Sequence, residues 1–149
     1  MPRTSLIATL SNPPSADGVE LTALSDTVEW LEVRADLLGD IDPDWLRSHF
    51  KGRLLYALRT HDGLVNRPER LKTAARFYDR IELEAEMDLS EELLHAVPVE
   101  KRLVSWYGSV AGLSQLTDQF GETNRKACQL RLTQRLTPSS YQPWSVNTG

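Results

Sequence analysis

Short segments rich in β-branched and other apolar residues alternate with helical segments along most of the chain, and this alternation restricts the fold more than any other feature. The predicted strands cover residues 5–11, 27–36, 53–60, 80–88 and 102–108, so a strand begins every 22 to 27 residues. Each interval is long enough to hold one helix. Strands that are joined by helices in this way lie parallel in one sheet, which indicates an α/β protein.

Several of the connecting segments carry helix signals. In residues 67–78, apolar side chains recur at the spacing of one helix face: Leu71, Ala74, Ala75 and Tyr78. Asp42 before Pro43, and Ser90 before two glutamates, are typical helix starts. Residues 112–120 predict a weaker helix.

Two parallel architectures fit this alternation, a doubly wound open sheet and a (β/α)8 barrel. Strands that are buried on both faces of an open sheet read as nearly continuous apolar runs. Here the strands alternate instead, with Glu32 and Arg34 on one face of the second strand and Leu31 and Val33 on the other. The polar groups gather toward the carboxyl ends of the strands, where barrels hold their active sites. This pattern favours an incomplete (β/α)8 TIM barrel of five to six βα units.

Charge and composition argue against several classes of function. The formal net charge of −4 disfavours nucleic acid as the main partner, and the single cysteine, Cys128, excludes a disulfide framework or a cysteine-based metal cluster. No apolar run is long enough for a transmembrane helix, and the N-terminus lacks a secretory signal. We therefore expect a cytoplasmic protein whose partner is a small molecule or another protein.

Charged side chains on the polar face allow two interpretations. Four glutamates supply negative charge that Arg34 and Arg59 balance in part: Glu32, Glu82, Glu84 and Glu86. They form either a buried ion-pair network or a site where the two arginines bind an anionic substrate. His61 shares the face of Arg59, and we interpret it as a solvent-facing histidine. The residues alone leave both interpretations of the charged face open.

Five motifs in order carry a family resemblance: WLEVRADLL (30–38), YALRT (56–60), DG (62–63), IELE (81–84) and VSWYG (104–108). Over about residues 5–123 the chain resembles type I 3-dehydroquinate dehydratase, a (β/α)8 barrel enzyme of the shikimate pathway that is fused to shikimate dehydrogenase in some organisms. The resemblance implies a lyase that converts 3-dehydroquinate to 3-dehydroshikimate and water through a lysine imine, with no metal, nucleotide or other cofactor. The implied partner is a small carboxylate.

The resemblance assigns roles by position. Glu32 and Arg34 fall on the motif that orients the catalytic histidine and contacts the substrate, and Arg59 falls on the arginine that binds the substrate carboxylate. Thr9 matches a first-strand hydroxyl near the substrate. Asp62 matches the acidic residue that follows the carboxylate-binding arginine.

Two catalytic positions depart from the family pattern. Tyr107 occupies the place of the fifth-strand histidine, and a phenol, with a pKa of about 10, is a poor general base at neutral pH. Lys126 is the lysine nearest to the imine position, and it would begin a sixth strand over 127–132. Glu84 matches a fourth-strand glutamate that we interpret as structural.

Composition changes after about residue 123. We expect residues 1–123 to form the partial barrel and residues 124–149 to form a divergent basic tail, with one further strand followed by irregular chain over 137–149. A second hypothesis is a catalytically impaired barrel remnant that binds a small carboxylate or a protein partner, as a homo-oligomer that covers its open edges. A third is a different lyase that uses the same glutamates and arginines.

Overall fold

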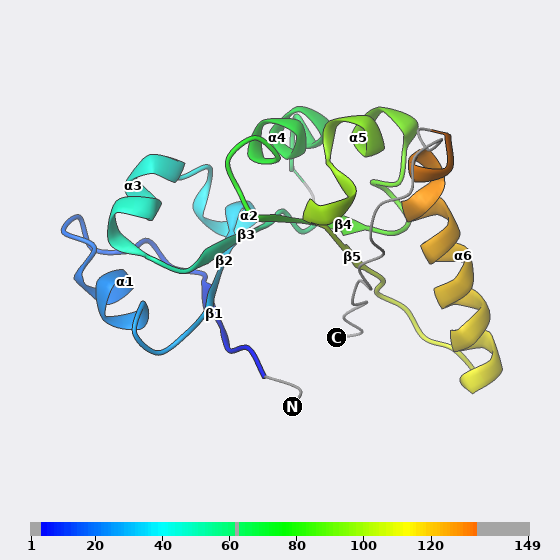
Figure 1. Ribbon diagram of the computed structural model, residues 1–149, viewed down its shortest axis with the longest axis horizontal. Coiled ribbons are helices and arrows are strands. Elements are labelled where there is room, and N and C mark those ends of the chain that lie inside the picture. The colour runs from blue at the N-terminus through cyan, green and yellow to red at the C-terminus, as the bar shows by residue number, and fades with distance from the viewer. Residues whose placement is uncertain (1–3, 62, 134–149) are drawn as a thin grey trace. The chain divides into compact units, whose positions relative to one another are not determined.

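The computed structural model describes residues 4–61 and 63–133, and within them strands and helices alternate from end to end (Figure 1). The strands are β1 (Ile7–Leu10), β2 (Trp30–Arg34), β3 (Arg53–Ala57), β4 (Arg80–Glu84) and β5 (Arg102–Ser105). The helices are α1 (Val19–Leu24), α2 (Ala35–Leu38), α3 (Pro43–His49), α4 (Arg67–Ala74), α5 (Glu91–Ala96), the 3-10 turn η1 (Val99–Lys101) and α6 (Leu113–Thr133). All five predicted strands are therefore confirmed.

The strands are hydrogen-bonded in the order of the sequence, β1-β2-β3-β4-β5, as in part of a (β/α)8 barrel, whereas the strand order of a doubly wound sheet reverses. β1 pairs with β2, and β2 with β3, in parallel, which confirms the predicted parallel sheet. The chain divides into two compact units, residues 1–81 and 82–149, which we call the first and second units.

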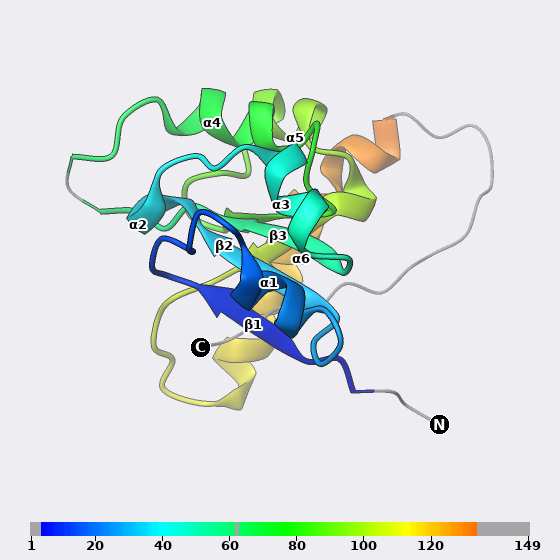
Figure 2. The same cartoon turned by 90° about the vertical axis from the view of Figure 1, so that its left-hand side faces the viewer.

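In the first unit, the alternation along β2 matches the sequence pattern. Leu31 and Val33 are fully buried, whereas Glu32 and Arg34 are partly exposed on the opposite face. Helices α1 and α3 lie side by side (Figure 2). The hydroxyl of Ser25, which follows α1, donates to the backbone carbonyl of His49 at the end of α3, at 3.4 Å.

Both predicted helix starts are confirmed. The Asp42 carboxylate accepts a hydrogen bond from the backbone N–H of Asp44 at 3.0 Å, and the Ser90 hydroxyl accepts one from Leu93 at 3.3 Å. Helix α4 is shorter than residues 67–78, because the chain turns after Ala74 to enter β4. The four apolar side chains that predicted its buried face are all buried: Leu71, Ala74, Ala75 and Tyr78.

In the second unit, the prediction of a strand over 127–132 is wrong, because one continuous helix, α6, covers Leu113–Thr133. Alanine, glutamine, leucine and basic residues dominate this segment, and all of them favour helix over strand. Thr123 and Ala127 lie one turn apart on the buried side of α6. The helix continues through residue 123, where composition changes, and the domain boundary placed there stays a prediction. Residues 137–149, expected to be irregular, lie outside the described residues.

Candidate active site at the carboxyl ends of β2 and β3

The polar face of the first unit brings four of the predicted substrate-binding residues together. Thr9 on β1 and Glu32 on β2 are direct partners in the parallel register, so their side chains share one face of the sheet. Arg34 follows on the same face of β2. Arg59 lies two residues beyond the end of β3, whose Ala57 is the partner of Arg34. Thr9 is exposed, whereas the other three side chains are partly covered.

Glu32 and Arg59 form an ion pair across the ends of β2 and β3. Arg59 Nη2 lies 3.5 Å from Glu32 Oε1, which is longer than an ordinary N–H···O hydrogen bond. The Glu32 side chain is 15% exposed and the Arg59 side chain 42% exposed. Arg59 therefore presents part of a planar, multi-donor cation to solvent beside a well-covered carboxylate, and such a cation suits bidentate binding of a carboxylate.

Arg34 is held by Asp36, which the sequence argument did not single out. Arg34 Nε and Nη2 donate to the two oxygens of the Asp36 carboxylate at 2.9 and 2.6 Å. Burial by itself would raise the pKa of Asp36, but the Arg34 hydrogen bonds, the Arg59 backbone N–H and the Arg34 charge together lower it below 3.8. The sequence offered one signal for this pairing, an acidic residue two positions after Arg34 in the segment VRAD (33–36).

The remaining candidates of the first unit contribute less to this site. Asp62 lies outside the described residues, so its predicted role stays untested. His61 is exposed, as expected of a solvent-facing histidine. No group of three His, Cys, Asp or Glu side chains that could hold a metal ion occurs among the described residues.

In the second unit, a buried carboxylate organises the residues at the carboxyl ends of β4 and β5. Glu82 Oε1 accepts hydrogen bonds from Tyr107 Oη at 2.7 Å and from Ser105 Oγ at 2.5 Å. Glu82 and Ser105 are buried, whereas Tyr107 remains 46% exposed. The Tyr107 phenol therefore donates a hydrogen bond to the buried carboxylate of Glu82. Glu84 instead lies at a local turn, where its backbone N–H donates to Asp88 Oδ2 at 2.7 Å.

Lys126 does not lie where the imine lysine was expected. It sits on α6, is 54% exposed, and its ammonium lies 2.8 Å from Glu122 Oε1 one turn earlier in the helix. The other lysines are Lys51, which precedes β3, Lys72 in α4 and Lys101 in η1. None of these lysines follows the carboxyl end of a described strand. The expectation that Lys126 begins a strand is therefore wrong.

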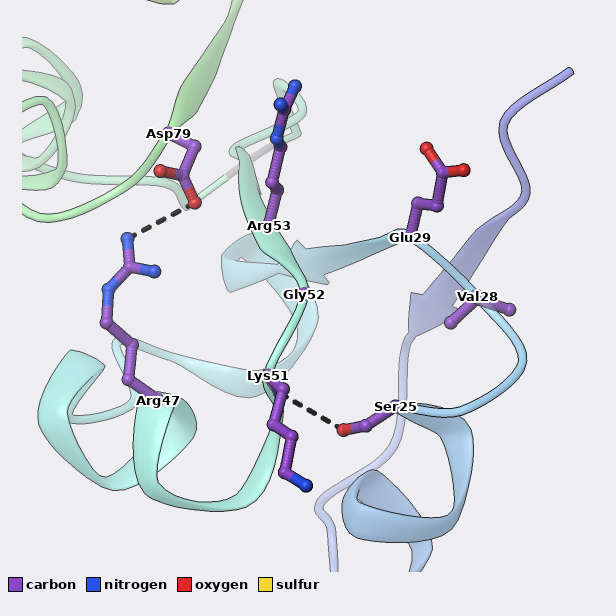
Figure 3. Close-up of a pocket in the computed structure, with 8 residues that line it drawn as sticks. All are labelled: Ser25, Val28, Glu29, Arg47, Lys51, Gly52, Arg53 and Asp79. Carbon is purple, nitrogen blue, oxygen red and sulfur yellow. Dashed lines mark hydrogen bonds and ion pairs between the residues drawn. The ribbon is translucent and has the colours of Figure 1, made fainter. Parts of the chain in front are cut away.

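An open hollow of about 510 Å³ lies at the opposite end of β2 and β3 (Figure 3). Arg47 pairs with Asp79 at 3.2 Å, and the Lys51 backbone N–H donates to the Ser25 hydroxyl at 3.1 Å. The side chains of Lys51 and Arg53 point in different directions from the strand (Figure 3). Because these cations do not converge, the carboxyl end of β2 and β3 is the better candidate site.

In the part of the chain that the structure describes, no helix has the combination of length and apolar character needed to cross a bilayer.

No protein-family model and no curated protein matches this sequence. Among solved structures, the chain is similar to the 3-dehydroquinate dehydratase from Aquifex aeolicus VF5, with a TM-score of 0.57 over 82% of this chain and 12% sequence identity. The chain spans 62% of that protein's length. At this identity the likeness concerns the fold. It confirms an α/β fold in which five parallel strands alternate with helices and which resembles part of a TIM-barrel dehydratase.

Proposed function

We propose that this protein binds a small hydroxylated carboxylate of the 3-dehydroquinate type at the carboxyl ends of β2 and β3. The observation that carries the proposal is the half-exposed Arg59 guanidinium beside the covered carboxylate of Glu32. The structural likeness to a 3-dehydroquinate dehydratase supports this choice of substrate class, as does the resemblance of the motifs around both residues.

Each residue of the proposed site has a distinct task. Arg59 binds the substrate carboxylate through paired N–H donors. Glu32 balances the charge of Arg59 while the site is empty and accepts a hydrogen bond from a substrate hydroxyl. Thr9 supplies a second polar contact from β1. Arg34 contributes to substrate binding only indirectly, because its guanidinium is already hydrogen-bonded to Asp36 at the carboxyl end of β2.

The second part of the proposal concerns catalysis, the dehydration of the bound 3-dehydroquinate. The dehydration breaks one C–H and one C–O bond, forms a C=C bond and releases the hydroxyl with a proton as water. A lysine imine would acidify the C–H, and a lysine amine must be partly neutral to form it. The described lysines lie on helices or ahead of strands, so substrate binding is better supported than catalysis.

The test combines binding with imine trapping. Calorimetry of the protein with 3-dehydroquinate should give saturable binding that Arg59→Ala weakens about tenfold or more, because a charge-assisted pair is lost. Arg53→Ala removes the same charge from the opposite end of β3 and should leave affinity unchanged. Equal affinity in the two variants, or no binding by folded protein, would overturn the proposal.

Borohydride trapping decides between the two hypotheses about catalysis. A covalent adduct in the intact mass after incubation with 3-dehydroquinate and borohydride would establish the imine, and peptide mapping would locate its lysine. Binding without an adduct would favour the second hypothesis, a carboxylate-binding protein that has lost the lyase reaction. The exposed position of Lys126 and its pairing with Glu122 favour this second outcome for that lysine.

A further inference from the structure

Strand β1 is an edge strand with exposed apolar residues. It stands at one end of the sheet order, and β2 is the only described strand that pairs with it. Leu6 is 55% and Ile7 51% exposed at this edge. An edge strand presents backbone N–H and C=O groups that can pair with another strand, and proteins commonly protect such edges with charged side chains.

The hydrogen bonds to β2 determine which backbone groups of β1 point outward. The carbonyl of Leu6 accepts from the Trp30 backbone N–H at 3.2 Å, so Leu6 directs its backbone groups toward β2. Backbone direction alternates along a strand, and Ala8 and Leu10 therefore also face β2. The backbone groups of Ile7 and Thr9 consequently face away from the sheet.

The sequence around this edge is symmetric about Ala8. Residues 5–11 read SLIATLS, so that serine matches serine, leucine matches leucine, and β-branched Ile7 matches β-branched Thr9 when the segment is reversed. No Asp, Glu, Lys or Arg occurs in residues 4–16. An antiparallel pairing of this segment with itself would therefore set like side chains opposite each other without charge repulsion.

We infer that β1 pairs with β1 of a second copy of this chain, antiparallel and about a two-fold axis at Ala8. A two-fold interface requires a surface that is complementary to itself, and the symmetric, uncharged segment meets that requirement. The strand at the other end of the sheet order, β5, includes Arg102 and reads RLVS, which has no such symmetry.

The register about Ala8 satisfies the backbone. Ile7 lies opposite Thr9 of the second copy, and these are the two β1 residues whose backbone groups face outward, so the pair exchanges both N–H···O bonds. Ala8 lies opposite Ala8 at a non-hydrogen-bonded position, where strands approach most closely and a small side chain fits. A register shifted by one residue would place an outward-facing residue opposite one that faces β2.

The first test is the mass of the full-length chain in solution. Light scattering after gel filtration should give a mass that rises from 16.9 kDa toward twice that value between about 10 µM and about 500 µM protein. Amide hydrogen exchange followed by NMR should show Ile7 and Thr9 becoming protected over the same range. Ala8 and Leu10, which face β2, should be protected at both ends of the range.

Ile7→Lys introduces a charge at the edge and should weaken dimerisation about tenfold. Val19→Lys is the matched control, because it also replaces an exposed aliphatic residue with lysine, on α1, and should dimerise like the unmodified chain. Ile7→Pro removes an outward-facing N–H and should act like Ile7→Lys while preserving the β1–β2 pairing. Circular dichroism of each variant establishes that it is folded.

Several outcomes would overturn the inference. A mass that stays at 16.9 kDa at all concentrations would exclude the dimer. If the Ile7 and Thr9 amides were protected in such a monomer, another segment of the same chain would be pairing with β1. Masses that grow beyond a dimer would indicate open-ended association. A dimer that is weakened equally by Ile7→Lys and Val19→Lys would place the interface elsewhere.

Discussion

The Asp36 carboxylate binds the Arg34 guanidinium through two hydrogen bonds, of 2.9 and 2.6 Å, across a single intervening residue at the carboxyl end of β2. Both side chains are well covered, at 3% exposure for Asp36 and 17% for Arg34. The backbone N–H of Arg59 also contributes to the lowered pKa of Asp36. One carboxylate therefore holds an arginine of β2 beside the segment from which the proposed substrate-binding arginine extends.

Replacing Asp36 by asparagine should destabilise the protein by about 2 kcal/mol, because it removes the charge of a carboxylate that is paired with a largely covered guanidinium. Urea denaturation followed by circular dichroism measures the effect. Glu69→Gln is the control, since it breaks the exposed Lys72–Glu69 pair and should cost less than about 0.5 kcal/mol. Equal losses in the two variants would contradict the buried role of Asp36.

The Asp36–Arg34 pair should also make stability depend on acid. The pKa of Asp36 is lowered in the folded state, so the unfolded chain binds more protons than the folded one as the pH falls. The stabilisation from this carboxylate is therefore complete above its ordinary pKa of 3.8 and is lost as the pH falls through the lowered value. Between about pH 5 and about pH 3, the unmodified protein should lose more unfolding free energy than Asp36→Asn. If the unmodified protein and Asp36→Asn lost the same unfolding free energy over this pH range, other carboxylates would account for the acid dependence.

In the second unit, the hydrogen bond from Tyr107 to Glu82 should contribute measurably to stability. Tyr107→Phe removes one donor to a buried carboxylate and should cost about 1 kcal/mol in urea denaturation. In the background of Glu82→Leu, which has no acceptor, the same substitution should have little effect. Equal costs in both backgrounds would mean that Tyr107 contributes through packing instead.

Local patterns in the sequence predicted most of the fold, because strand alternation and helix caps depend on neighbouring residues. The Asp42 and Ser90 caps and the two faces of β2 follow from this. The error at α6 arose because family spacing was used to place a strand over 127–132, whereas helix-forming residues dominate that segment.

The candidate site was predictable only in part. The face shared by Thr9, Glu32 and Arg34 follows from the period of a strand. Two pairings could not be predicted, Arg34 with Asp36 and Tyr107 with Glu82. Each depends on side-chain direction and burial in three dimensions, and the sequence offers several nearby acidic residues as partners for each donor.

Arg102 provides a final prediction, about how α6 is held within the second unit. Its buried guanidinium donates to the carbonyls of Val97 at 2.8 Å, Leu94 at 2.5 Å and Ala127, which joins the end of α5 to α6. Burial lowers the pKa of Arg102, and these acceptors are uncharged carbonyls. Arg102→Met would leave all three of them without this donor.

We expect Arg102→Met to destabilise the protein by about 2 to 4 kcal/mol and to increase proteolytic cleavage within α6. Arg102→Lys should recover only part of the loss, because one ammonium cannot reproduce the three directions of the guanidinium. Arg125→Met removes an exposed arginine from α6 itself and should change stability by less than about 0.5 kcal/mol. If Arg102→Met and Arg125→Met behaved alike in urea denaturation and in proteolysis, these three hydrogen bonds would not be what holds α6 in place.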